Sequence, residues 1–292
     1  MATYERASQD MGNVVSLDHL NLTITDQQTA TLFYVVGLGF TRDPYLTVGL
    51  ENMWLNLGRQ QLHLPTRPEA QTVRGRIGLV VPDLEELDAR LGSVEPGLAG
   101  TSFAHSRGKD SIDVTGPWGN RFRCAAPGGA FGGTLMGMPY VEFDVAPGTA
   151  AGIARFYETV LGASVSVAPP EARGDGVGGA CSVQVGRGQS LRFRETEEKL
   201  PAYDGHHLAV YLADFSSPHA ALGGRGLVTE ESNEHQYRFV DIVDPESGEV
   251  LHQLEHEVRS MYHPMFGRPL VNRDPSLTQR NYRRGADALA IG

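Results

Sequence analysis

The chain has 292 residues, 40% hydrophobic and 21% charged, which is enough for one large domain or two of average size. The formal net charge of -10 argues against nucleic acid as a partner, because phosphate binding needs a basic face. No run of about 18 apolar residues occurs, so we expect no membrane span. We expect a cytoplasmic protein with Cys124 and Cys181 reduced, since the two cysteines are few and far apart.

The first elements follow a strand–helix–strands order. Residues 17–24 alternate apolar and polar side chains, which predicts a half-buried strand. Asp26 is placed to cap a short helix over residues 27–36 that ends at Gly37. Residues 52–57 and 60–64 then alternate on either side of a turn, which predicts a hairpin.

The same order recurs three times. Strands are predicted over 76–81, 101–105, 111–115, 121–125, 237–243 and 250–258, and helices over 84–91 and 217–223, with Asp83 and Asp214 as caps. The third unit runs over 139–194 and the fourth over 206–258. The glycine-rich stretch 126–137 predicts the boundary between two pairs of units.

The units are internal repeats. His19 precedes Phe33-Tyr34 by fourteen residues, and Glu142 precedes Phe156-Tyr157 by the same spacing, at an offset of 123 residues. The strand that opens at Arg76 resembles the strand that opens at His207, at an offset of 131. One equivalent strand position therefore carries His19, Arg76, Glu142 and His207, and a histidine or a carboxylate there can ligate a metal ion.

Four such units, with an aromatic pair before a short glycine turn in the first and the third, resemble the vicinal oxygen chelate superfamily over residues 15–258. That superfamily includes glyoxalases, extradiol dioxygenases, an epimerase and antibiotic-resistance proteins. The resemblance implies an α+β fold of four βαβββ modules in two pairs, each pair forming a cup-shaped mixed sheet. We expect an N-terminal pair over 14–127, a C-terminal pair over 137–260 with the active site, and a C-terminal arm over 261–292.

The resemblance also implies a metal site in the C-terminal pair. Glu142 and His207 stand at the positions of strand-borne ligands, and the last strand, 250–258, is expected to supply a third. Counting from the preceding turn selects His252, whereas a strand bulge selects Glu255, the option we favour. Three protein ligands on one face leave positions for substrate oxygens. The alternatives, in which neither residue ligates a metal ion, are a rim carboxylate for Glu142 and a core histidine for His207.

The N-terminal pair is expected to be metal-free. His19 and His63 are ligand types, but the partner positions carry Arg76 and Arg123, and a guanidinium cannot ligate a metal ion. We therefore expect this pair to be structural.

The resemblance implies further site residues in the C-terminal pair. His235 stands where extradiol dioxygenases have a pocket histidine, and Tyr237 lies close to their catalytic tyrosine. Arg192 and Arg194 occupy the strand that carries an acid–base histidine in those enzymes, and they suit an anionic substrate if they point inward. The alternative for both arginines is an exposed strand face.

The predicted function is a metal-dependent enzyme for a small molecule with vicinal oxygens, most simply a ring-cleaving dioxygenase. The alternatives are a glyoxalase-like or epimerase-like lyase or isomerase, with Glu142 or Glu255 as base, and a metal-free binding protein of the resistance type. The expected cofactor is Fe(II), with Mn(II), Zn(II) and Ni(II) as alternatives. A homo-oligomer is expected, in which the arm covers a neighbouring subunit's site.

Overall fold

The structure is a computed structural model that describes residues 4–46, 51–128, 131, 133–168, 178–273 and 280–281. The rest of the predicted arm, 274–279 and 282–292, lies outside the described residues. Among the helices of the described part, none combines the length and the apolar character that a bilayer crossing requires.

Four modules follow one another along the chain, after the short 3-10 helix η1 (Arg6–Gln9). The first contains β1 (Val14–Asn21), α1 (Gln27–Ala30), η2 (Thr31–Gly37), β2 (Thr41–Arg42), β3 (Asn52–Leu57) and β4 (Gln60–Pro65). The second contains β5 (Gly75–Val80), α2 (Leu84–Val94), η3 (Glu95–Leu98), β6 (Ala104–Arg107), β7 (Ser111–Thr115) and β8 (Arg121–Ala125). The third contains β9 (Gly137–Val145), α3 (Ala150–Leu161), β10 (Val165–Ala168), β11 (Ala180–Gly186) and β12 (Gln189–Glu195). The fourth contains β13 (His207–Leu212), α4 (Ser216–Gly223), β14 (Val228–Asn233), β15 (Gln236–Val243) and β16 (Val250–Ser260).

The strands form two eight-stranded mixed sheets, which confirms the predicted fold class. One sheet has the order β14-β15-β16-β13-β1-β4-β3-β2, and the other has the order β10-β11-β12-β9-β5-β8-β7-β6. Each module contributes four neighbouring strands, and its first and last strands lie side by side, in parallel for β1 with β4 and for β5 with β8. The first module therefore shares a sheet with the fourth, and the second with the third, whereas we expected the first to share one with the second and the third with the fourth.

Local sequence signals explain where the helices begin. The Asp26 side chain accepts a hydrogen bond from the Thr29 amide at 2.6 Å, and the Asp83 side chain accepts from the amides of Glu85 and Glu86. Each carboxylate satisfies amides that have no partner within the first helical turn. The α1 helix continues into the π-helical segment η2, so that one continuous helix covers the predicted range.

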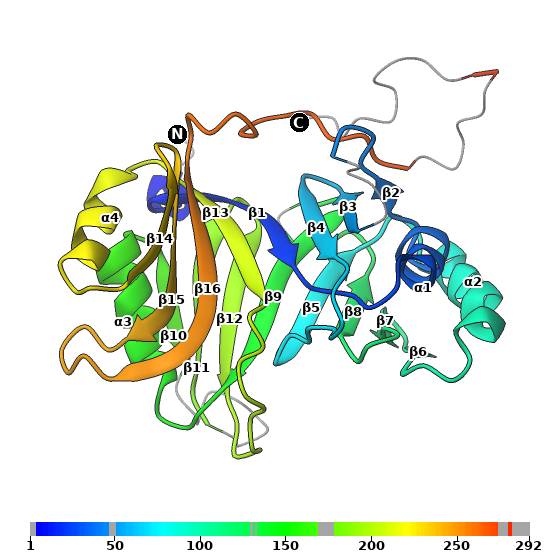
Figure 1. Cartoon of the computed structure of the whole chain (residues 1–292), viewed down its shortest axis with the longest axis horizontal. Coiled ribbons are helices and arrows are strands. Elements are labelled where there is room, and N and C mark those ends of the chain that lie inside the picture. The colour runs from blue at the N-terminus through cyan, green and yellow to red at the C-terminus, as the bar shows by residue number, and fades with distance from the viewer. Residues whose placement is uncertain are drawn as a thin grey trace. The chain divides into compact units, whose positions relative to one another are not determined.

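The chain folds into two compact units. One contains Met1–Leu17, Glu142–Tyr203 and Leu208–Phe266. In it α3 lies beside α4 and covers strands of the third and fourth modules (Figure 1). Aromatic side chains fill the space beneath α3, and Phe156, Tyr157, Phe193 and Phe239 are almost fully buried there.

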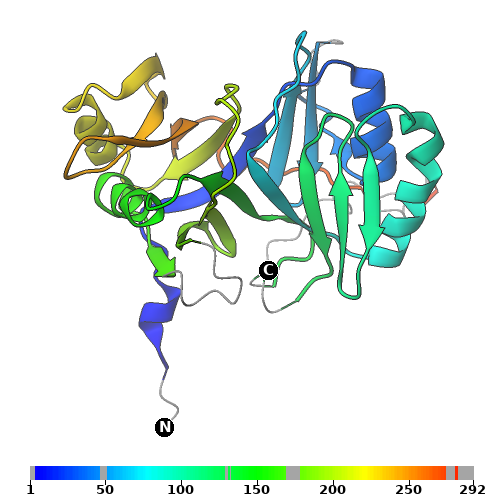
Figure 2. The same ribbon diagram turned by 90° about the horizontal axis from the view of Figure 1, so that it is seen from below.

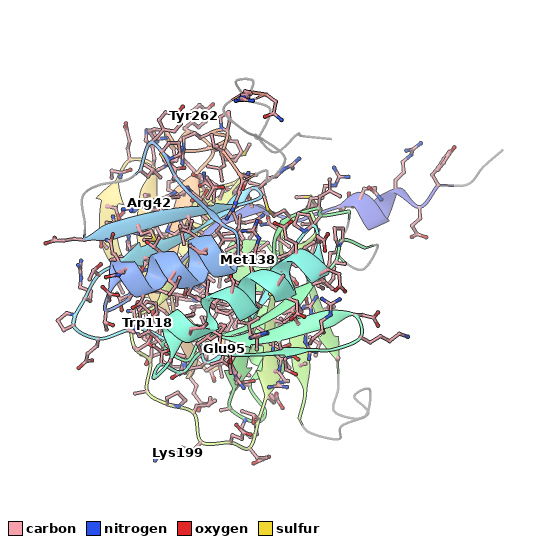
Figure 3. All side chains as sticks on the ribbon, turned by 90° about the vertical axis from the view of Figure 1, so that its right-hand side faces the viewer. Arg42, Glu95, Trp118, Met138, Lys199 and Tyr262 are labelled. Carbon is pink, nitrogen blue, oxygen red and sulfur yellow. The ribbon has the colours of Figure 1, made fainter. Side chains whose placement is uncertain are left out.

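The other compact unit contains Asp18–Val141, Asp204–His207 and Gly267–Gly292. Its helices η2 and α2 pack side by side, as two views show (Figures 1 and 2). Figure 3 looks onto these helices, with Trp118 labelled, whose Nε1 donates a hydrogen bond to Thr25 Oγ1 at 2.8 Å just before α1. The described arm residues Gly267 to Arg273 belong to this unit and bond to the first module of the same chain.

Candidate metal centre

The centre of the site is His19, on β1. The side chain is 1% exposed, and its Nδ1 lies 2.9 Å from the Asp18 carboxylate. Because a carboxylate only accepts, Nδ1 carries a proton, and in the neutral imidazole Nε2 then carries the lone pair. Nε2 is buried and has no hydrogen-bond partner among the described residues. A buried nitrogen lone pair without a donor is an uncommon arrangement that a cation or a ligand donor would satisfy.

Aromatic rings surround His19. The rings of Trp54, His63 and His207 have centroids 4.9, 5.9 and 6.0 Å from that of His19. Trp54 stacks on His63 at 3.9 Å, since the two residues are paired across β3 and β4. The His63 ring is also held by Asn21 and Asn52, at 2.6 and 2.7 Å from its two nitrogens. His63 therefore forms a fixed wall beside His19, with both nitrogens engaged.

The carboxylate of the site belongs to Glu257, on β16. Its side chain is buried, and its two oxygens form ion pairs with Arg238 and with Arg259, the latter at 2.5 Å. Arg238 also pairs with Glu255, which stands two residues earlier on the strand. The hydrogen bond from Arg238 and the ion pair with Arg259 fix the direction of the Glu257 carboxylate. A carboxylate oxygen has more than one lone pair, so an ion pair does not preclude ligation of a cation.

His19, His207 and Glu257 are the one group of three such side chains in the described part of the chain whose ligand atoms lie within 4.8 Å of one another. They come from β1, β13 and β16, which are three neighbouring strands of one sheet. His207 is half-buried at the start of β13, so the group retains access to solvent on that side.

These residues fit a divalent cation. Two imidazoles and one carboxylate are ligands of first-row divalent metals, and this combination with open positions is typical of non-haem Fe(II) oxygenases. The Asp18–His19 pair also fits a metal site, because a metal-ligating histidine commonly donates its other N–H to a carboxylate. The donor types and the hydrogen bond from His19 to Asp18 are thus those that a metal site uses.

The residue of the last strand that belongs to the group of three is Glu257, whereas Glu255 or His252 was expected. The register between β15 and β16 shifts between Phe239 and Asp241, which is the irregularity that the choice of Glu255 assumed. Glu255 nevertheless pairs with Arg238 and stands outside the group of three. His252 is 5% exposed and lies among the rings of Phe143 and Phe193, in the core beneath α3.

The residues predicted on the third module lie in the other sheet. Glu142 is half-buried on β9 and is absent from the group of possible ligands. On β12, Arg194 forms an ion pair with Asp144 at 2.7 Å, and Arg192 donates to Ser190 at 3.3 Å. Sheet membership separates these side chains from His207, because β9 and β12 belong to the sheet that lacks β13.

The two remaining predicted residues lie on the β14–β15 hairpin. His235 is in its turn, 3.3 Å from the Glu234 carboxylate. Tyr237 is buried against Phe215 and His219, and burial raises the pKa of its phenol, with the charges of Glu231 and Asp214 adding to the effect. Phe215 is the N-cap of α4 and His219 lies within α4, so Tyr237 is a core residue of the fourth module.

Sequence reasoning missed Glu257 and the joining of His19 with His207. One signal was present in the repeat itself. The four opening strands carry two histidines, an arginine and a glutamate, and the sheets join the strands of His19 and His207 in one and those of Arg76 and Glu142 in the other. Grouping the modules by their ligand type would have selected the observed pair.

No protein-family model matches this chain, and no curated protein matches it. Solved structures do. A putative dioxygenase from Bacillus subtilis is 14% identical with a TM-score of 0.56, over 85% of this chain and 86% of that one. Glyoxalase I from Zea mays is 13% identical with a TM-score of 0.58, over 84% of this chain and 92% of that one. The chain therefore has the same fold as these two proteins, which agrees with the fold expected from its resemblance to the vicinal oxygen chelate superfamily.

Proposed function

We propose that this protein is a metal-dependent enzyme that holds a divalent cation with His19, His207 and Glu257 and acts on a small molecule carrying two neighbouring oxygens. The observation that supports it most is the buried, unpartnered Nε2 of His19, in a group with a second imidazole and a carboxylate. We favour Fe(II) and a ring-cleaving oxygenation, because two histidines and one carboxylate are the ligand set of non-haem Fe(II) oxygenases.

The chain's own residues have separable tasks in this proposal. Asp18 fixes the tautomer and the ring direction of His19. Arg238 and Arg259 orient the Glu257 carboxylate and offset its charge. Trp54 and His63 form a flat aromatic surface beside the site, against which a planar substrate would be held. When bound, the cation supplies Lewis acidity and a site for chelating adjacent oxygens.

A second candidate is a lyase or isomerase that moves a proton next to a carbonyl. The similarity of the fold to glyoxalase I supports it, and it needs the same three ligands with a redox-inactive cation. In that case a proton acceptor is also required. His63 has suitable chemistry and its ring lies 5.9 Å from that of His19, but its nitrogens are held by Asn21 and Asn52, which makes the oxygenase the simpler proposal.

Metal analysis of anaerobically purified protein tests the proposal. We expect about one cation per chain in the wild type and a clear loss in His19→Ala, in His207→Ala and in Glu257→Gln. His252→Ala is the matched control, because this histidine lies in the aromatic core and outside the group of three. Its metal content should stay at the wild-type level.

Oxygen uptake with catechols then separates the two chemistries. Uptake that requires Fe(II) and is lost in His19→Ala supports ring cleavage. Isomerisation of a hemithioacetal without oxygen consumption supports the second candidate. A wild-type protein that takes up no divalent cation after reconstitution contradicts both, and points to a metal-free binding protein.

A further inference from the structure

The C-terminal arm bonds to the first module of its own chain. Asn272 is 4% exposed, and its side chain bonds to both backbone groups of Gly58, with its Oδ1 2.8 Å from the Gly58 amide and its Nδ2 3.0 Å from the carbonyl. The Asn56 side chain donates to the Val271 carbonyl at 2.7 Å. The arm is thus fixed at the turn and the last residues of β3, rather than frayed.

Arg268 anchors the arm at a buried charge. Its Nη2 lies 2.9 Å from Oδ2 of Asp43, a carboxylate that is 0% exposed. The amides of Tyr45 and Leu46 donate to the other oxygen at 2.8 and 2.9 Å. Burial raises the pKa of Asp43, but the hydrogen bonds and charge of Arg268 and these amides outweigh it and hold the pKa below its usual value. Asp43 is therefore an anion that is paired with the cation of the arm.

Asp43 accepts a hydrogen bond from Gln61 on β4, and β4 pairs with β1, the strand that carries His19. Gln61 Nε2 donates to Asp43 at 3.1 Å and to Asn56 at 2.7 Å, so both hydrogens of this buried amide are engaged. Gln61 on β4 is the register partner of His19 on the parallel strand β1. Paired residues of neighbouring strands lie about 4.8 Å apart and share a face, so the Gln61 side chain leaves the sheet on the same side as that of His19.

We propose that Arg268 is a positioning residue of the metal centre. It fixes Asp43, Asp43 holds the Gln61 side chain, and Gln61 on β4 supports the neighbouring position of His19 on β1. The inference rests on the proposed function. It assigns the arm a task within its own subunit, in place of the predicted task in a neighbouring one. Without the guanidinium, Asp43 loses this ion pair, and one of the two acceptors that hold the Gln61 amide beside His19 is less firmly fixed.

Titration with Co(II) tests this, because its visible absorption reports ligand geometry as well as occupancy. We expect Arg268→Ala to raise the dissociation constant for Co(II) about tenfold, as loss of an outer-shell partner commonly does, and to change the absorption bands. Arg268→Lys should give an intermediate constant. The control is Arg273→Ala, on the same arm, whose guanidinium donates only to the Val35 carbonyl in the described structure.

A double variant separates positioning from charge compensation. In Asp43→Asn with Arg268→Ala no buried charge remains, so we expect thermal stability to recover relative to Arg268→Ala alone, while Co(II) binding stays weak. If Arg268→Ala and Arg273→Ala bind Co(II) with the same constant and bands while His19→Ala does not bind it, the arm is only structural and the inference is overturned. If wild type binds no Co(II), or His19→Ala binds it unchanged, the proposed function fails and the inference with it.

Discussion

A neutral, buried histidine should make this protein less stable as the pH falls below about 6.5. His256 on β16 is 0% exposed. Its Nδ1 lies 2.7 Å from the Leu254 carbonyl and its Nε2 lies 2.7 Å from the Tyr157 hydroxyl. Nδ1 therefore donates to the carbonyl, and Nε2 accepts from the phenol. A second proton would displace the phenol as donor, in a site that is also covered by the stacked ring of Phe239 at 4.3 Å.

The size of the effect follows from the two protonation equilibria. Burial lowers the pKa of His256 from 6.5 to about 3, although the hydrogen bond to Leu254 favours the charged form. Since the unfolded chain takes up the proton at a higher pH than the folded chain, this contribution to stability is fully present above pH 6.5. It is lost as the pH falls towards about 3, by about 1.4 kcal/mol per pH unit, or roughly 5 kcal/mol over the window.

Urea unfolding between pH 4 and pH 8 measures this dependence. At pH 7 we expect His256→Gln to be less stable than wild type by about 1–3 kcal/mol, because a satisfied buried pair is disturbed. Below pH 6.5 the difference should shrink, since the glutamine does not titrate. Tyr157→Phe is the matched control: it loses about 1 kcal/mol with the phenol and keeps the wild-type slope. Parallel curves for wild type and His256→Gln would refute the reasoning.

Three further substitutions test individual contacts. Asp18→Asn should weaken Co(II) binding about 10–100-fold, because the carboxylate partner of His19 is lost, and a change below about twofold in titration would contradict this. Gly58→Ala should lower the free energy of unfolding in urea by more than about 1 kcal/mol, since its φ is +67° and a Cβ would lie 2.0 Å from the Met136 carbonyl oxygen. Asp83→Ala should cost about 1 kcal/mol in thermal unfolding by removing the cap of α2, and Asp110→Ala, at an exposed position, provides the unchanged reference.

Local sequence patterns were sufficient for the elements of the fold. Alternation predicted β3, β7 and β8 with the bounds that the structure has, because a side-chain period of two follows from strand geometry alone. Asp26 and Asp83 marked helix starts for an equally local reason, since a cap needs only the amides two or three residues ahead. The repeat then gave the number and order of the modules.

The sequence by itself thus determined the modules, their order along the chain and the ligand types on their opening strands. Which modules share a sheet is seen only in the tertiary structure. It places His19 and His207 in one sheet and Glu142 in the other. It also decided that Glu257, rather than Glu255 or His252, stands with them, and that Arg268 meets a carboxylate 225 residues away. Strand pairing and buried ion pairs join residues that are distant along the chain. A local sequence pattern does not identify the distant strand that supplies the partner, because it depends only on neighbouring residues.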